Sequence, residues 1–317
     1  MKLTSSLKRI LIFFTFLILL SQAKILMFTD ISVEPVFKDA FTAVNKAQVY
    51  LVSYADGPEI FHKNQNALTA SALNKGVDFF LNYKKSHLDK EFLEKNKNIF
   101  SQKKGAGYWL WKPWIILKTL QIIKENAIVI YADSGFVFHS PLQPLIDLAI
   151  QHPIILVDYD PSLHGNLGQI TKRETLVKMG CDTPVSRQGK HLWAAFSVFR
   201  NTSESREFVK KWLEYCSDES ILTDTPSTLP EYPEFRGHAH DESVLSTLYN
   251  LEPNGKHLIT VPEFYKYADW HHRHPGREYE SLLPKMGKMI RGIERKVLNS
   301  SWMISLRRFV LEKFPLT

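Results

Sequence analysis

The sequence contains few of the residues and motifs on which several protein classes depend. Only two cysteines occur among 317 residues, too few for a disulfide framework or a four-cysteine zinc site. The Walker phosphate loop, the G-x-G-x-x-G fingerprint and the G-x-S-x-G elbow of hydrolases are all missing. No internal repeat, low-complexity tract or Gly/Ser-rich linker divides the chain. These absences exclude small stapled scaffolds and zinc fingers, and they argue against a serine hydrolase.

What remains has the composition of an ordinary globular protein. Hydrophobic residues make up 44% and charged residues 23% of the chain, which is typical of a folded protein with a continuous core. The formal net charge is +7, but most of it lies in the last part of the chain, residues 285–317. Because the excess of positive charge is confined to this tail and does not extend along the body of the protein, we do not expect a nucleic-acid partner.

The N-terminus has the layout of a signal sequence. Basic residues (Lys2, Lys8 and Arg9) precede the apolar run Ile10–Leu20, and small residues follow up to Ala23. We predict that residues 1–23 are a signal peptide or an uncleaved signal anchor. The protein is then expected to be secreted, periplasmic or in the lumen of the secretory pathway, or anchored with its body beyond the membrane.

The C-terminus, residues 285–317, combines basic residues with apolar ones at helical spacing. Two interpretations stay open for this extension. It can lie on an anionic membrane surface as a basic amphipathic helix pair, or it can dock on the domain with its Lys/Arg face in water. We predict that residues 24–284 form one domain.

Within this domain, short apolar runs alternate with helical patterns. Strands are predicted at residues 24–30, 48–54, 78–83, 127–131 and 153–157, and helices at 67–73, 114–124, 141–150 and 244–251. Buried strands that alternate with helices predict an α/β fold with a mostly parallel central sheet flanked by helices.

Ligands of such sheets bind beyond the carboxyl ends of the strands. Asp133 follows the most apolar predicted strand and is followed closely by Gly135, so it is a candidate ligand for a divalent cation. The alternative is that Asp133 only caps the next turn. Asp158 and Asp160, after another predicted strand, form a weaker second candidate.

The segment from Gly105 to Trp114, GAGYWLWKPW, is the densest feature of the chain. Its tryptophans and tyrosine can form a stacking wall for a base or a sugar ring. Its glycines allow close backbone approach, and Lys112 beside a helix N-terminus can neutralise a phosphate. Structural packing of the aromatic residues is the alternative.

A cluster of histidines and acids precedes the last predicted helix. His238, His240, Asp241 and Glu242 can supply a metal ligand and a general acid or base. A helix cap at Asp241 with exposed histidines would give the same pattern. A second histidine cluster, His271–His274, suits phosphate or metal, or is simply solvated.

Taken together, these motifs resemble a family of GT-A-type glycosyltransferase-like proteins in the nucleotide-diphospho-sugar transferase superfamily. The resemblance rests on GYWLWKP at 107–113, YADSG at 131–135, Thr171–Arg173 and HAHDES at 238–243. Two positions depart from the H-R-H-D-Q-S pattern, where Ala239 replaces Arg and Glu242 replaces Gln.

The resemblance implies a GT-A-like domain, a nucleotide-sugar donor and Mn²⁺ or Mg²⁺. The acceptor would be a glycan, lipid or protein hydroxyl. The implied catalytic residues are Asp241 and Glu242, and the implied metal ligands are Asp133, His238 and His240. The implied donor-binding residues are Gly105, Gly107, Tyr108, Trp109, Trp111, Lys112, Thr171, Lys172 and Arg173. A non-catalytic sugar-nucleotide or carbohydrate-binding protein on the same fold is the alternative, and a hydrolase that uses the His/Asp clusters is a third.

Overall fold

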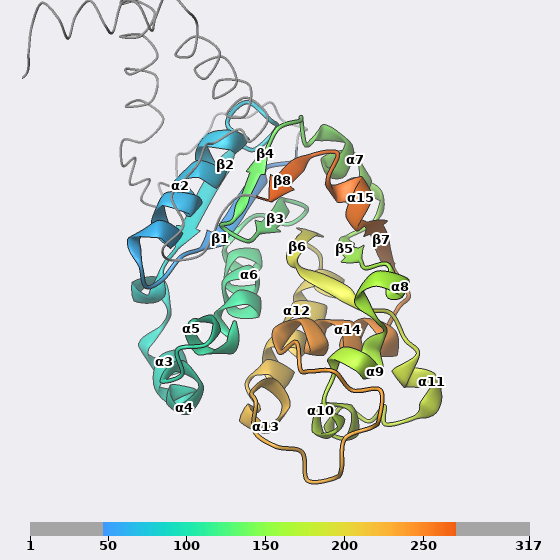
Figure 1. Cartoon of the computed structure of the whole chain (residues 1–317). Helices are drawn as coiled ribbons and strands as arrows, with labels where there is room; N and C mark the ends of the chain where they lie inside the picture. Colours follow the sequence, from blue (N-terminus) through green and yellow to red (C-terminus); the bar gives the residue numbers. More distant parts are fainter. Residues whose placement is uncertain (1–46, 271–317) are drawn as a thin grey trace, which may run out of the picture.

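The computed structural model describes residues 47–270. The predicted leader, the predicted strand 24–30, the His271–His274 cluster and the basic extension lie outside the described residues. Among residues 47–270, no helix is long and apolar enough to cross a membrane. Figure 1 shows the central sheet between two layers of helices, with a further group of short helices below.

The main sheet has six strands. In their order across the sheet they are β2 (Phe79–Tyr83), β1 (Val49–Tyr54), β3 (Ile128–Ala132), β6 (Leu192–Arg200), β5 (Ile154–Asp158) and β7 (Lys256–Thr260). Strand β1 pairs in parallel with β2 and β3, and β5 pairs in parallel with β7. Only β6 in this sheet is antiparallel to its neighbours, β3 and β5. Strands β4 (Phe136–Phe138) and β8 (Ala268–Trp270) form a separate antiparallel pair.

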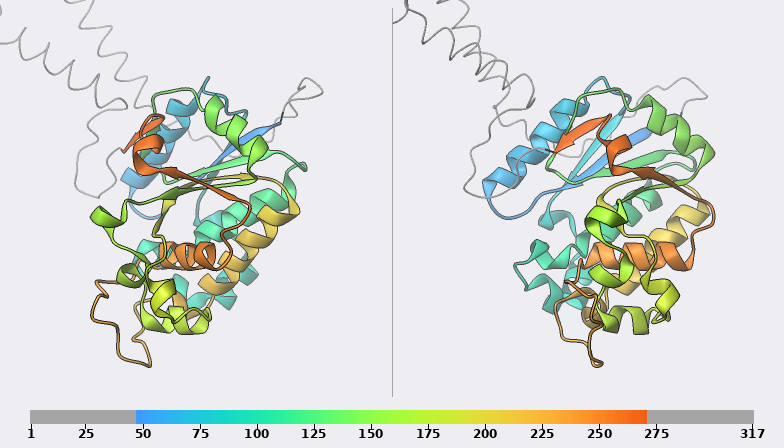
Figure 2. Two further views of the ribbon diagram at one scale, coloured as in Figure 1. Left: turned by 90° about the vertical axis from the view of Figure 1, so that its right-hand side faces the viewer. Right: turned by 45° about the vertical axis from the view of Figure 1, so that its right-hand side comes forward.

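Each face of the sheet has its own hydrophobic core, as the alternation of side chains along a strand requires. One face packs against α6 (Trp111–Ile122), α12 (Ser203–Cys216) and α14 (Asp241–Leu251). The other packs against α2 (Glu59–Ala72), α7 (Gln143–Gln151) and α15 (Val261–Phe264). Both views of Figure 2 show the sheet between these two groups.

Short helices occupy the connections. Between β2 and α6 lie η1 (Lys85–His87), α3 (Lys90–Lys95), α4 (Lys97–Phe100) and the turn labelled α5 (Gly105–Tyr108). Between β5 and β6 lie α8 (Pro161–His164), α9 (Leu167–Ile170), α10 (Arg173–Lys178) and α11 (Pro184–Arg187), and α13 (Glu219–Leu222) follows α12.

The predicted α/β fold with a mostly parallel, helix-flanked sheet is confirmed. The strands predicted at 48–54, 78–83, 127–131 and 153–157 correspond to β1, β2, β3 and β5, and the four predicted helices to α2, α6, α7 and α14. Strand β6 was not predicted. It is buried along almost its whole length, so its run of apolar residues gives no alternation that would distinguish a strand from a buried helix.

Candidate functional site

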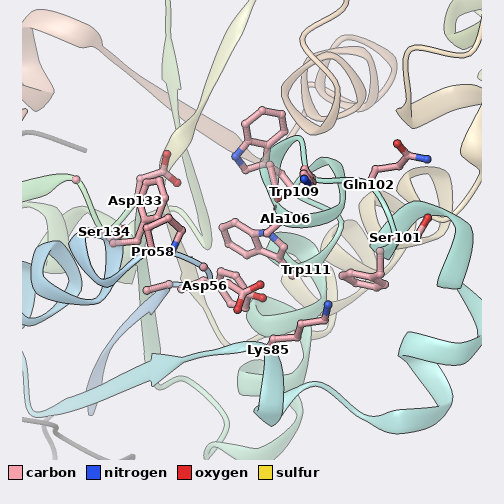
Figure 3. A pocket seen from close by; sticks show the side chains of 18 residues that line it. Asp56, Pro58, Lys85, Ser101, Gln102, Ala106, Trp109, Trp111, Asp133 and Ser134 are labelled. Atoms are coloured by element: carbon pink, nitrogen blue, oxygen red, sulfur yellow. Dashed lines mark hydrogen bonds between the residues drawn. The ribbon is translucent and has the colours of Figure 1, made fainter. Parts of the chain in front are cut away.

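A cavity of about 650 Å³ opens beside the carboxyl ends of β1, β2 and β3. Its wall includes Tyr54 at the end of β1, Lys85 just after β2 and Asp133 just after β3. Figure 3 shows Asp133 and Lys85 on different sides of this cavity, with Trp109 and Trp111 between them. The position is the one at which parallel α/β sheets bind ligands, and the volume suits a ligand of nucleotide size.

One wall of the cavity is aromatic. The Tyr54 and Trp111 rings stack, with centroids 4.0 Å apart and an interplanar angle of 14°. The Tyr54 hydroxyl is buried and has no hydrogen-bond partner among the described residues, and burial raises its pKa further above the usual value. A buried hydroxyl without a partner is energetically unfavourable, so this cavity wall offers a ready donor or acceptor to a ligand.

The charged groups on the cavity wall are of both signs. Lys85 and Lys103 contribute ammonium groups, and Asp56 and Asp133 contribute carboxylates. Within residues 47–270, neither lysine side chain forms an ion pair or a side-chain hydrogen bond. The two ammonium groups are therefore available to an anionic ligand.

The GAGYW segment forms a left-handed turn. Five consecutive residues have positive φ: Gly105 (+55°), Ala106 (+51°), Gly107 (+97°), Tyr108 (+51°) and Trp109 (+59°). This conformation is unfavourable for residues other than glycine. Packing requires the two glycines, because a Cβ atom at Gly105 would lie 2.4 Å from the Trp109 ring, and one at Gly107 would lie 2.7 Å from the Phe100 ring.

The aromatic block therefore divides between two roles. Trp109 and Trp111 line the cavity, as a stacking wall would. Tyr108 is buried and its hydroxyl donates to Asp224 Oδ2 at 2.9 Å. Trp114 is buried and stacks on Phe92 with centroids 5.3 Å apart, so it belongs to the core.

Lys112 lies in the first turn of α6, behind the cavity wall. Its Nζ atom is 2.8 Å from Asp241 Oδ2 and 3.6 Å from Asp133 Oδ1. The Tyr131 hydroxyl donates to the same Oδ1 of Asp133 at 2.6 Å. The contact with Asp241 is an ion pair without hydrogen-bond alignment, because Asp241 Oδ2 has no partner of hydrogen-bond geometry in the described part of the chain. Side-chain exposure is 4% for Lys112 and Asp241 and 22% for Asp133.

The pKa values of Lys112 and Asp241 are shifted by their burial and by their neighbouring charges. Burial lowers the pKa of Lys112, but attraction to Asp133 and Asp241 outweighs it, so the net pKa shift is upward and the ammonium stays charged. Burial raises the pKa of Asp241 to about 7, although Lys112 opposes this shift. Asp241 is not on the cavity wall, so an acceptor in the cavity does not meet it directly. Its predicted role as a general base stays a prediction.

The sequence alternative for Asp241, a helix N-cap, is wrong. His240 is the N-cap residue of α14, with φ +58° and ψ −120°, and no side-chain cap is formed. Asp241 is the first residue of the helix, and its backbone carbonyl accepts from Trp212 Nε1 at 3.0 Å. The side chain is thus committed to Lys112.

Glu242, the other predicted catalytic residue, points toward β6. Its Oε1 atom contacts His191 Nε2 at 2.8 Å, and its Oε2 atom accepts from the backbone N–H of Ala194 at 3.0 Å. Both oxygens therefore already have partners, and they join α14 to the sheet. A catalytic role for Glu242 stays a prediction.

The residues predicted to hold a metal ion do not form one group. His238 Nε2 donates to the Ile221 carbonyl at 2.8 Å, and His240 Nδ1 donates to the Leu222 carbonyl at 2.9 Å. Across residues 47–270, no three His, Cys, Asp or Glu side chains come together as metal ligands. Of the predicted metal ligands, only Asp133 lies on the cavity wall, and one of its oxygens already contacts Tyr131 and Lys112. These residues do not fit a divalent-cation site.

The predicted donor-binding residues 171–173 lie away from the cavity. Lys172 Nζ donates to the carbonyls of Thr223 and Thr225 at 2.7 and 2.8 Å. Arg173 pairs with Asp182 at 3.1 Å. Arg173 Nη1 also donates to the Pro230 carbonyl at 3.1 Å, so both side chains hold the long connection between α13 and α14. Thr171 Oγ1 is buried and has no hydrogen-bond partner among residues 47–270.

The second acidic candidate has a structural explanation. Asp158, at the end of β5, pairs with Lys190. Asp160 caps α8 by accepting from the backbone N–H of Ser162 at 2.9 Å. This arrangement agrees with the view that such acidic pairs are common in turns.

Three charged residues of the cavity were missed by the sequence analysis: Asp56, Lys85 and Lys103. A signal existed for the first, since Asp56 and Gly57 follow strand β1 after one intervening residue. The strand-end rule therefore applies to Asp56 as it does to Asp133. The lysines carry no such signal, because Lys85 begins the short helix η1 after β2 and Lys103 lies in a turn after α4.

Comparisons with known proteins give only a distant likeness. No protein-family model matches the chain, and no curated protein is similar to it in sequence. Mouse xyloside xylosyltransferase 1 is 10% identical, with a TM-score of 0.41 over 67% of this chain and 85% of that one. An active-site mutant of LgtC is 11% identical, with a TM-score of 0.41 over 77% of this chain and 95% of that one. Glucosyl-3-phosphoglycerate synthase from Mycobacterium tuberculosis, solved with Mn²⁺ and UDP, is 13% identical, with a TM-score of 0.34 over 80% of this chain and 79% of that one.

Proposed function

We propose that this chain is a glycosyltransferase that moves a sugar from a nucleotide-diphosphate donor to a hydroxyl group of a glycan, lipid or protein. The observation that carries the proposal is the cavity at the carboxyl ends of β1, β2 and β3. It combines an aromatic wall, a buried hydroxyl without a partner and two available ammonium groups. These are the features that a planar base and a diphosphate require.

Different residues of the cavity wall would contact different parts of the donor. The stacked pair Tyr54 and Trp111, with Trp109 nearby, offers apolar faces to a base or a sugar ring. Lys85 and Lys103 offer positive charge to the diphosphate. Asp133, fixed by Tyr131, presents its remaining oxygen to a sugar hydroxyl.

The chemistry required is cleavage of the bond between the anomeric carbon and the diphosphate oxygen. The electron pair of this bond goes to the diphosphate, and the acceptor hydroxyl forms the new bond and loses its proton to a base. Ammonium groups fixed beside the leaving oxygen stabilise its developing charge. Of the carboxylates described above, Asp56 and Asp133 are the two on the cavity wall that can accept the proton.

A panel of sugar nucleotides tests the proposal. UDP-, GDP- and CDP-linked sugars are first screened for thermal stabilisation of the protein, and the stabilising donors are then assayed for transfer to alcohol and sugar acceptors. We expect Lys85→Met to weaken donor binding by about 1.5–3 kcal/mol, the value of a hydrogen bond to a charged group. Lys118→Met is the matched control, because Lys118 lies on α6 and pairs with Asp89 on the surface.

The outcomes separate the two functions considered. Donor stabilisation with transfer supports the glycosyltransferase. Donor stabilisation without transfer or hydrolysis would indicate a binding protein on the same fold. A panel without any stabilising nucleotide would contradict both.

A further inference from the structure

We propose that Lys112 takes the place of a divalent cation beside Asp133, so that lysines bind the donor diphosphate without a metal ion. This inference rests on the proposed function and deepens it, because it concerns how the same cavity balances the charge of its donor.

The position of the Lys112 ammonium is the first argument. It lies between two carboxylates from different elements, 2.8 Å from Asp241 on α14 and 3.6 Å from Asp133 after β3. The rings of Tyr131 and Trp111 add cation–π contacts, with the ammonium 5.5 and 5.9 Å from their centroids. A cation that bridged these two carboxylates would have to occupy the space of the ammonium.

The second argument is the orientation of the other predicted ligands. A ring nitrogen of His238 donates to the Ile221 carbonyl, and one of His240 donates to the Leu222 carbonyl. These hydrogen bonds fix both rings in the connection that precedes α14. Of the predicted ligands, a divalent ion on the cavity wall would therefore find only the Asp133 carboxylate, with the fixed positive charge of Lys112 3.6 Å behind it. Repulsion between the two cations disfavours this arrangement.

The third argument is the balance of charge around the cavity. Asp133 alone would repel a diphosphate, and Lys112 neutralises this carboxylate from behind. Lys85 and Lys103 then face the cavity and supply the positive charge that the diphosphate meets. Lys112 is thus a positioning residue, which acts through Asp133, and Lys85 and Lys103 are the contact residues.

The test measures how nucleoside diphosphate affinity depends on metal. UDP, GDP and CDP are titrated calorimetrically into the wild-type protein with excess EDTA and again with Mn²⁺. We expect affinities that agree within about twofold in the two conditions. Binding that is about tenfold or more tighter with Mn²⁺ would overturn the inference while leaving the proposed function intact. Failure of every nucleotide to bind in both conditions would instead refute the proposed function, and this inference with it.

Lys112→Met adds a readout that a merely structural role would not change. In EDTA we expect the variant to bind the diphosphate about tenfold more weakly than wild type or worse. Mn²⁺ should recover part of the loss, because Asp133 and Asp241 then have no cation between them. A folded variant whose affinity is unchanged in EDTA, or is not improved by Mn²⁺, would contradict the inference. Lys118→Met is the control on the same helix, and the wild-type comparison decides the question if Lys112→Met does not fold.

Discussion

Replacing Gly105 by alanine tests whether the left-handed turn positions the aromatic wall. The residue has φ +55°, and an added Cβ atom would lie 2.4, 2.5 and 2.7 Å from three atoms of the Trp109 ring. The positive φ costs roughly 1 kcal/mol in a non-glycine residue, and overpacking of a tight contact adds about 1–3 kcal/mol. We therefore expect Gly105→Ala to lower the free energy of unfolding by roughly 2–4 kcal/mol.

Chemical denaturation measures this loss, and calorimetry with a nucleoside diphosphate measures its effect on the cavity. The matched control is Gly180→Ala, because Gly180 also has positive φ (+73°) but its Cβ would meet no atom within 4 Å. The control should lose only the backbone contribution of roughly 1 kcal/mol and keep its ligand affinity. If the two variants lose equal stability and bind equally well, the packing argument for Trp109 is refuted.

Three further changes have defined outcomes. Lys172→Met removes an ammonium that donates to two carbonyls, so we expect a melting temperature roughly 5–10 °C lower and an unchanged nucleotide affinity. A variant that loses nucleotide affinity at full stability would show that Lys172 contacts the donor after all. The pKa of His238 lies well below its usual value, first because the side chain is buried and then because the charges of His240 and Lys172 disfavour its protonation. The contribution of neutral His238 is therefore complete above the unfolded-state pKa of about 6.5 and declines as the pH falls below it. Between pH ~7.5 and pH ~5.5 the free energy of unfolding of the wild type should fall by roughly 1.4 kcal/mol more than that of His238→Gln. Denaturant titrations that show the same pH dependence of stability for both proteins would contradict this. Trp111→Leu removes the ring that stacks on Tyr54 and should weaken nucleotide binding by roughly 1–3 kcal/mol, whereas Trp114→Leu, a core change, should lower stability and leave the affinity of the folded protein unchanged.

The main sheet could be predicted because its parallel strands are buried on both faces. Ile128–Ala132 and Ile154–Asp158 are short apolar runs between helical patterns, and such runs mark a covered parallel sheet. The strand-end rule then placed Asp133 correctly on the cavity wall. Local patterns and one topological rule were sufficient for this part of the site.

The partners of Asp133 and Asp241 could not be predicted in the same way. Lys112 reaches both carboxylates only because α6 and α14 pack on the same face of the sheet, and no local pattern encodes that contact. Nothing in the HAHDE segment distinguishes imidazoles that bind carbonyls from imidazoles that bind a metal. In the GAGYW segment, the contacts with Trp109 and Phe100 require the two glycines, and Gly105 also lines the cavity, so its predicted role in donor binding stays a prediction.

The most direct test of the proposed activity is the release of free nucleoside diphosphate from a stabilising sugar nucleotide in the presence of an acceptor. The measurement compares wild type with Asp133→Asn, which keeps the shape of the side chain and removes its charge. We expect the wild type to release diphosphate in step with glycoside formation, and the variant to be slower by roughly a hundredfold. Equal rates in the two proteins, or no release by the wild type from any donor that it binds, would contradict transfer at this cavity.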